Sequence, residues 1–127
     1  MEAVIRLDTH VVVWLYTGEI ERLSDGAVEA LEAEELIVSP MVQLELTFLH
    51  EIGRLSVTGA DIIGDLANRV GLRLSGAPMA TVVQAAAPLT WTRDPFDRMI
   101  VADAHADGAS LITKDREIHR NTTIATW

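Results

Sequence analysis

Short apolar segments alternate with helix-like segments along the whole chain. The apolar segments are of strand length, and we expect strands at residues 4–7, 36–39, 72–75, 110–113 and, in brief form, 123–125. Between them the pattern predicts helices near residues 9–15, 26–33, 41–53, 61–70, 79–87 and 94–107. Strands that alternate with helices form a parallel sheet with both faces covered, so the sequence predicts an α/β fold.

Length and composition predict one folded domain that spans residues 1–127. The 127 residues match the size of a single domain, and a sequence with 49% hydrophobic and 23% charged residues can bury a core. The absence of cysteine excludes disulfides, thiolate zinc sites and a thiol nucleophile. No apolar run approaches the roughly 20 residues that cross a bilayer, and no secretion signal is visible. We therefore expect a cytoplasmic protein without a membrane segment.

The net charge of −9, from 19 acids against 10 Lys and Arg, limits the possible partners. A protein that grips nucleic acid through a broad basic surface has the opposite charge balance. A protein that reaches phosphates through bound cations remains compatible with this charge, and so does one that binds a basic partner.

Residues 94–104 contain an acid on an apolar helix face. Asp94 is placed as a helix N-cap, Pro95 as the first helical residue and Asp97 in the first turn. At about 100° per residue, Asp97 shares its face with Val101. A carboxylate on an apolar face costs several kcal/mol, roughly, unless another group satisfies it.

A second acid has the same unusual position in the helix expected at residues 41–53. Glu45 lies near the middle of a broad apolar arc, and a Glu in such a place is rarely buried without a partner. Arg6, Arg93 and Arg98 are candidates for that partner. The arc consists of Met41, Val42, Leu44, Leu46, Phe48, Leu49 and Ile52.

Two further acids follow predicted strands. Asp8 comes after the first strand and Asp115 after the fourth, and ligands of open parallel sheets bind beyond these strand ends. The helices that carry Glu45 and Asp97 start at the same edge. We therefore expect four carboxylates from separate segments to share one pocket.

Four like charges in one pocket raise each other's pKa unless a cation is present. Mg²⁺, with Mn²⁺ as an alternative, prefers oxygen ligands and retains waters, which leaves positions for a phosphate. Divalent cations also activate water for the hydrolysis of phosphodiesters. The acids thus predict a metal-dependent site.

Each of these residues also has a purely structural interpretation. Asp8 and Asp94 can cap the helices that follow them, and Asp115 can be a turn aspartate. Thr113 is either an ordinary strand residue or a hydroxyl that orients Asp115 or a metal-bound water. The other polar and aromatic candidates are interpreted as surface or structural residues (His10, His50, His105 and His119) and as core residues (Trp14 and Trp91).

The same segments carry a resemblance to a known family. They are Leu7-Asp8-Thr9-His10 followed by Trp14-Leu15, then Glu45, then Arg93-Asp94-Pro95-Phe96-Asp97-Arg98 and the residues up to Ala104, and finally Leu111-Ile112-Thr113-Lys114-Asp115. In this order and spacing, which covers essentially the whole chain, the sequence resembles PIN-domain ribonucleases, and more narrowly the VapC-like toxins of toxin–antitoxin pairs.

The resemblance implies a three-layer α/β/α sandwich and a Mg²⁺-dependent endoribonuclease that hydrolyses RNA through a metal-activated water. It implies that the acidic quartet both holds the metal and carries catalysis, with Thr113 as an accessory catalytic hydroxyl. The quartet falls on Asp8, Glu45, Asp97 and Asp115.

The resemblance also implies partners. VapC-like proteins pair as homodimers and are silenced by a small antitoxin that inserts a basic side chain into the acidic pocket, which suits the net charge of −9. Asp103 stands where relatives carry a neutral residue, so we expect it to alter the field at the site.

Three other classes of protein are alternatives to this interpretation. A catalytically silent PIN fold would serve only for binding, although all four acids are present. A phosphoacceptor receiver would suit Thr113 and Lys114, but it would need paired acids where Asp8 is followed by Thr9. A phosphatase of the haloacid dehalogenase type would need a second Asp at the position of His10.

Overall fold

The computed structural model describes residues 4–127. All five strands form one parallel sheet in the order β3-β2-β1-β4-β5. The predicted α/β class is confirmed, and the expected strands are present, with ends that differ by at most two residues. The strands are β1 (Val4–Leu7), β2 (Glu35–Val38), β3 (Arg73–Leu74), β4 (Ser110–Ile112) and β5 (Ala125–Thr126).

All six expected helices are present, together with two short elements that the sequence analysis did not predict. The unpredicted elements are the 3₁₀ turn η1 (Ile20–Arg22) and helix α7 (Arg116–Asn121), in which only Ile118 is buried, so no apolar period revealed it. The expected helices are α1 (Thr9–Thr17), α2 (Asp25–Ala33), α3 (Pro40–Glu51), α5 (Met79–Ala86) and α6 (Pro95–Ala106), with α4 (Gly59–Val70) between α3 and β3.

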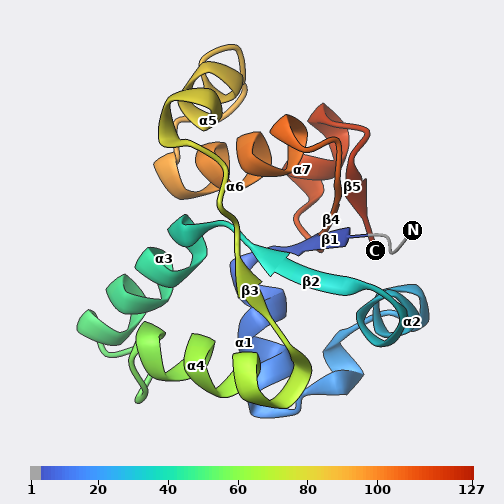
Figure 1. The fold of residues 1–127 in the computed structure, drawn as a ribbon, viewed down its shortest axis with the longest axis vertical. Helices are drawn as coiled ribbons and strands as arrows, with labels where there is room; N and C mark the ends of the chain where they lie inside the picture. Colours follow the sequence, from blue (N-terminus) through green and yellow to red (C-terminus); the bar gives the residue numbers. More distant parts are fainter. Residues whose placement is uncertain (1–3) are drawn as a thin grey trace.

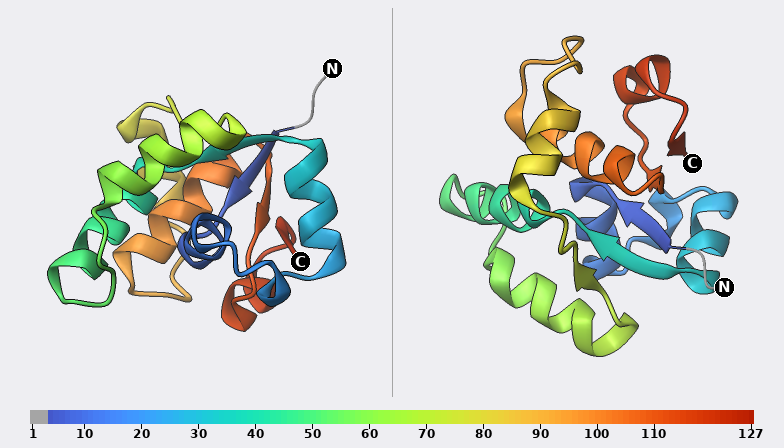
Figure 2. Two further views of the ribbon diagram at one scale, coloured as in Figure 1. Left: turned by 90° about the horizontal axis from the view of Figure 1, so that it is seen from below. Right: turned by 45° about the horizontal axis from the view of Figure 1, so that its top comes forward.

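Helices cover both faces of the sheet. Figure 1 shows α1, α2 and α4 on one side and α5, α6 and α7 on the other, which confirms the three-layer α/β/α arrangement. Helix α3 lies at the edge between the layers and packs against both α4 and α6, as the further views in Figure 2 also show. Within residues 4–127, none of these helices is long and apolar enough to span a bilayer.

The chain changes direction across the sheet between β1 and β4. From β1 it continues to β2 and then β3 on one side, and it returns through α5 and α6 to β4 on the other side. In open parallel sheets, such a switch point leaves a crevice beyond the carboxyl ends of the two central strands. The buried core around the sheet includes Leu7 of β1, Val38 of β2 and Leu111 of β4.

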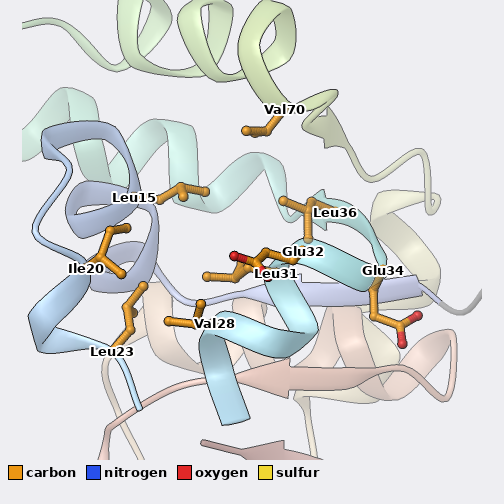
Figure 3. A pocket seen from close by; sticks show the side chains of 9 residues that line it. All are labelled: Leu15, Ile20, Leu23, Val28, Leu31, Glu32, Glu34, Leu36 and Val70. Atoms are coloured by element: carbon orange, nitrogen blue, oxygen red, sulfur yellow. The ribbon is translucent and has the colours of Figure 1, made fainter. Parts of the chain in front are cut away.

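An apolar cavity of about 430 Å³ lies on the face of α2, away from this switch point (Figure 3). Leu15, Leu31 and Leu36 supply much of its apolar lining, and Glu32 and Glu34 are its only charged residues among those described. Its lining offers apolar contact surface rather than a convergent set of polar groups, so it is suited to binding and not to acid–base or metal chemistry.

Candidate active site

A second cavity, of about 380 Å³, opens at the switch point. Five carboxylates from four separate segments of the chain line it, together with one basic and two aromatic side chains. These residues are Asp8, Glu45, Asp94, Asp97 and Asp115, with Lys114, His10 and Trp14. The structure thus brings together all four acids of the predicted quartet, and Asp94 joins them.

Asp8 is fixed in place by two hydrogen bonds at the end of β1. As the N-cap of α1, it accepts from the backbone N–H of Thr9 at 2.8 Å through Oδ1. Its Oδ2 accepts from Thr113 Oγ1 at 2.6 Å. Burial raises the pKa of Asp8, and these two hydrogen bonds oppose that rise. Capping and a place in the cavity are therefore compatible.

Thr113 links the two strand-end acids rather than lining the cavity itself. Its side chain is fully buried, and its hydroxyl donates to Asp8 while accepting from the backbone N–H of Asp115 at 3.1 Å. The sequence had suggested that the hydroxyl orients Asp115 or a metal-bound water. Its shorter hydrogen bond, of 2.6 Å, is instead the one to the Asp8 carboxylate. His119 Nε2 lies 2.7 Å from the Thr113 carbonyl oxygen and holds the same turn from the α7 side.

Asp115 begins α7 as its N-cap. One carboxylate oxygen accepts from the backbone N–H groups of Glu117 at 2.9 Å and Ile118 at 3.0 Å. The turn that follows β4 and the start of α7 therefore direct this carboxylate toward the edge of the sheet where Asp8 lies. Asp115 is therefore a turn aspartate, as its structural interpretation said, and its side chain also lines the cavity.

Glu45 has a hydroxyl partner and not an arginine. Thr9 Oγ1 donates to Glu45 Oε1 at 2.5 Å, so the first residue of α1 holds an acid of α3. Within residues 4–127, each proposed arginine partner is engaged elsewhere: Arg6 with two Asp side chains, and Arg93 and Arg98 with backbone carbonyls. The suggested Glu45–arginine pair is therefore wrong. Burial, and then the charges of the nearby acids, raise the pKa of Glu45 against the effect of the Thr9 hydrogen bond.

Asp94 and Asp97 stand together at the start of α6. Asp94 caps the helix by accepting from the backbone N–H groups of Phe96 at 2.8 Å and Asp97 at 3.2 Å. The Asp97 carboxylate is half-buried, and burial together with the charges of Asp8, Asp94, Glu45 and Asp115 raises its pKa to about 7. All four other acids of the cavity thus act on this one side chain.

The donor chemistry of the cavity fits a hydrated divalent cation. Carboxylate oxygens are the ligands that Mg²⁺ and Mn²⁺ prefer, and the mutual repulsion of these acids is what a cation would relieve. Among residues 4–127, no three His, Asp or Glu side chains stand as a ready-made cage for a metal ion. Mg²⁺ does not need such a cage, because it keeps several waters and contacts only one or two carboxylates directly.

Three residues of the cavity were not identified from the sequence. His10 had been interpreted as a surface or structural residue and Trp14 as core, yet both line the cavity from the first turns of α1. Lys114 was considered only as a feature of a rival class. For His10 and Trp14, the one available sequence signal was the spacing after Asp8. It places these two residues one helical turn apart on the helix that Asp8 caps.

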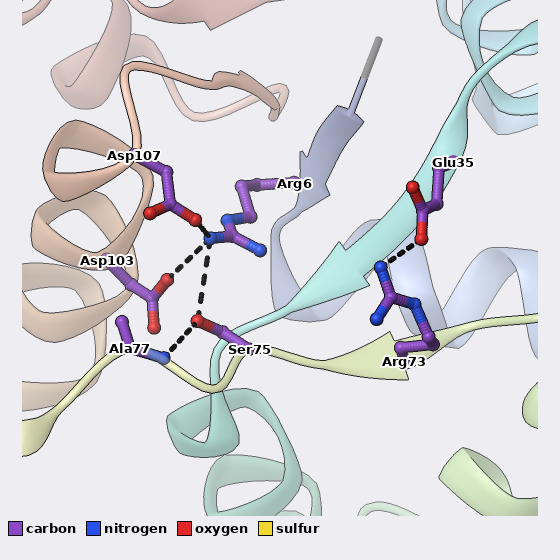
Figure 4. A network of polar contacts seen from close by, with 7 residues as sticks. All are labelled: Arg6, Glu35, Arg73, Ser75, Ala77, Asp103 and Asp107. Carbon is purple, nitrogen blue, oxygen red and sulfur yellow. Dashed lines mark hydrogen bonds and ion pairs between the residues drawn. The ribbon is translucent and has the colours of Figure 1, made fainter. Parts of the chain in front are cut away.

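Asp103 does not take part in the acidic cavity. It is buried against Arg6 of β1, with 3.1 Å between Arg6 Nη2 and Asp103 Oδ1, and Arg6 also pairs with Asp107 (Figure 4). Ser75 completes this network at 3.5 Å from Arg6. The charges that shift the pKa values of Asp8, Glu45 and Asp97 come from other residues, so the expected effect of Asp103 on the field of the site finds no support.

The family model of the PIN domain matches residues 5–123. The chain belongs to the PIN-domain family. Ribonuclease VapC22 of Mycobacterium tuberculosis is 37% identical over 123 residues, which cover 92% of this chain and 92% of that protein.

Solved structures share the PIN fold at low sequence identity. VapBC2 from Rickettsia felis, bound to a DNA fragment from its promoter, superposes with a TM-score of 0.66 at 15% identity and covers 93% of this chain and 92% of the other. A toxin–antitoxin complex from Klebsiella pneumoniae gives a TM-score of 0.66 at 15% identity, with coverage of 98% and 96%. At such identities the likeness establishes the fold alone.

Proposed function

We propose that this PIN-domain protein is a Mg²⁺-dependent endoribonuclease of the VapC type, the toxin of a toxin–antitoxin pair acting on cytoplasmic RNA. The observation that carries the proposal is the gathering of Asp8, Glu45, Asp97 and Asp115 around one cavity, where their charges help raise the pKa of Asp97 to about 7. The relative with 37% identity is named a ribonuclease, which supports the same activity here.

In this proposal the four acids hold Mg²⁺, or Mn²⁺ in its place, directly or through water. The bound ion supplies positive charge that activates a water and stabilises the leaving oxygen of the phosphodiester. Thr113 keeps Asp8 in position and Thr9 keeps Glu45 in position, so that the carboxylates are ordered before the substrate arrives. Lys114, on the rim of the cavity, contacts an RNA phosphate in a chain that is otherwise strongly acidic.

The proposed antitoxin is a small protein that places a basic side chain in the acidic cavity. The net charge of −9 favours a basic partner. The apolar cavity beside α2, with Glu32 and Glu34 in its lining, suits the apolar side chains of an amphipathic basic segment from the same partner. The similar structure from Klebsiella pneumoniae is named a toxin–antitoxin complex, which supports a partner of this kind.

A second copy of the chain is the other proposed partner. Between Arg73 and Arg93 the sequence has no charged residue, although α5 lies within this stretch and exposes Met79 and Val83. Two acidic copies repel each other wherever their charged surfaces meet, so an uncharged apolar face is the surface that favours their contact. This supports a homodimer that uses α5.

Cleavage of RNA with mapped ends tests the activity. We expect the wild-type protein to cut a single-stranded RNA in Mg²⁺ and to lose this activity in excess EDTA. Asp97→Asn and Glu45→Gln should abolish cleavage while the circular dichroism spectrum stays unchanged. Glu51→Gln is the matched control, because Glu51 is an exposed acid at the end of the same helix.

Two results would contradict the proposal: cleavage by Asp97→Asn at the wild-type rate, or full activity of the wild type in EDTA. A wild-type protein that binds Mg²⁺ and RNA but cuts no RNA would instead indicate the catalytically silent PIN fold.

A further inference from the structure

The cavity is lined by side chains of two chemical kinds. Besides the five carboxylates, the rings of His10 and Trp14 line it. The two rings come from successive turns of α1, with centroids 6.0 Å apart and planes inclined by 41°. The His10 side chain is exposed, and Trp14 is partly buried and lines the cavity. Metal chemistry at the acids does not account for these two aromatic side chains.

The Trp14 indole is held in place by two neighbouring side chains. Trp127 meets it edge-on, with 6.2 Å between ring centroids and an interplanar angle of 67°. The Arg22 guanidinium lies 5.9 Å from the centre of the Trp14 ring. A ring fixed by such contacts loses little conformational freedom when a ligand packs against it.

An RNA strand needs an attraction other than charge to enter this cavity. Lys114 is the only Lys or Arg among the described residues that line it, against five carboxylates. Stacking of a nucleobase on an aromatic side chain is insensitive to the sequence of the RNA and adds affinity without positive charge. The cavity of about 380 Å³ has room for a single base and its sugar.

We propose that His10 and Trp14 form a stacking platform for one unpaired nucleobase of the substrate, next to the phosphodiester that the acids act on. A base inside a duplex is stacked on its neighbours and cannot offer its face to the platform. The preferred substrate class is therefore single-stranded RNA or an unpaired loop. This inference rests on the proposed ribonuclease function for the identity of the ligand.

The test measures binding separately from cleavage. All proteins carry Asp97→Asn so that the RNA stays intact, and anisotropy of labelled RNA is measured in Mg²⁺. The probes are a single-stranded oligoribonucleotide of about eight nucleotides, the same strand with an abasic nucleotide at each position in turn, and the corresponding duplex. The platform variants are His10→Ala, Trp14→Leu and the conservative Trp14→Phe.

We expect one abasic position to weaken binding by about tenfold, and the duplex to bind more weakly than the single strand. In His10→Ala and Trp14→Leu this abasic effect should shrink, and Trp14→Phe should keep most of it. His105→Ala, whose ring lines a different cavity, should behave like the parent. Trp14 also packs against the core, so exposed His10 keeps the test valid if Trp14→Leu fails to fold.

Equal affinity for every abasic strand would overturn the platform, and so would an undiminished abasic effect in His10→Ala. Cleavage by the Asp97 wild-type protein, assayed in parallel, separates the two proposals. Cleavage without base-dependent binding removes the platform and leaves the nuclease. Base-dependent binding without cleavage removes the nuclease and leaves the platform.

Discussion

The acidic cavity disfavours the charged form of Asp97. Its pKa of about 7 in the folded protein compares with 3.8 for an ordinary Asp, so the folded state binds this proton more tightly than the unfolded state. Stability of the metal-free protein should therefore fall as the pH rises from about 4 to about 7, and should stay reduced above that range. The same charges make this position sensitive to a neutral substitution.

We predict that Asp97→Asn stabilises the metal-free protein at pH 8. Asn has no charge to repel, and the gain should be on the order of 2 kcal/mol after allowance for solvent screening. At pH 4 the gain should nearly vanish, because the wild-type carboxyl is then protonated in the folded state. Thermal unfolding in EDTA at both pH values measures this. Asp61→Asn, at an exposed acid of α4, should show no such pH-dependent gain.

Thr113 is predicted to act through the position of Asp8. Thr113→Val keeps the shape but leaves a buried carboxylate oxygen without its donor, which should cost about 1–3 kcal/mol. Because the hydroxyl orients a proposed metal ligand, cleavage should fall by about 10- to 100-fold. Thr113→Ser should restore both stability and activity, and Thr81→Val, at an exposed threonine of α5, is the control. Wild-type cleavage by Thr113→Val would contradict this role.

The sequence predicted the acids better than the rest of the cavity. Glu45 and Asp97 stood out because each lies on an apolar helix face, and Asp8 because it follows a strand. His10 and Trp14 carried no such local conflict, since a histidine on a helix surface and a tryptophan in a core are both ordinary. Their place beside the acids depends on how α1 lies against the neighbouring elements, which local periodicity does not contain.

At the scale of elements, α3 shows both what a helical pattern can predict and where it stops. The arc around Glu45 is apolar as predicted, yet Leu44, Phe48 and Ile52 are each about half exposed, at 53%, 45% and 50%. A broad apolar arc identifies a helix but does not say which part of it the neighbours α4 and α6 will cover. The position of Glu45 therefore depends on how closely α4 approaches α3.

Gly59 sets that approach at the start of α4. A Cβ at this position would lie 2.6 Å from the Gln43 carbonyl oxygen and 2.8 Å from Thr47 Oγ1, on either side of Glu45 in the sequence of α3. Gly59→Ala should therefore cost about 1–3 kcal/mol in urea denaturation and lower cleavage by shifting α3. Gly64→Ala in the same helix meets nothing within 4 Å and should be stabilising by about 0.5–1 kcal/mol. Equal effects of the two substitutions would contradict this packing argument.

At the scale of the whole molecule, the uncharged stretch that contains α5 predicts where two copies meet. Val83→Glu places a carboxylate on the proposed contact and should shift the protein to monomers in light-scattering chromatography. Val70→Glu is the matched control, because Val70 at the end of α4 is exposed to a similar degree, 44% against 49%. A wild-type protein that is monomeric at high concentration would remove the homodimer from the proposal.

We expect Mg²⁺, the proposed cofactor, also to stabilise the folded protein. An ion that binds the folded state alone stabilises it by about 2.7 kcal/mol at a hundred times its dissociation constant. We predict that Mg²⁺ raises the unfolding temperature at pH 8 and much less at pH 5, because protons compete for carboxylates whose pKa values are raised.

Monovalent salt also screens a protein of charge −9, so NaCl at matched ionic strength is the reference. Glu45→Gln should lose most of the Mg²⁺-specific increase and Glu51→Gln should retain it. An increase that NaCl reproduces in full would mean that the acids respond to general screening and not to a bound divalent ion.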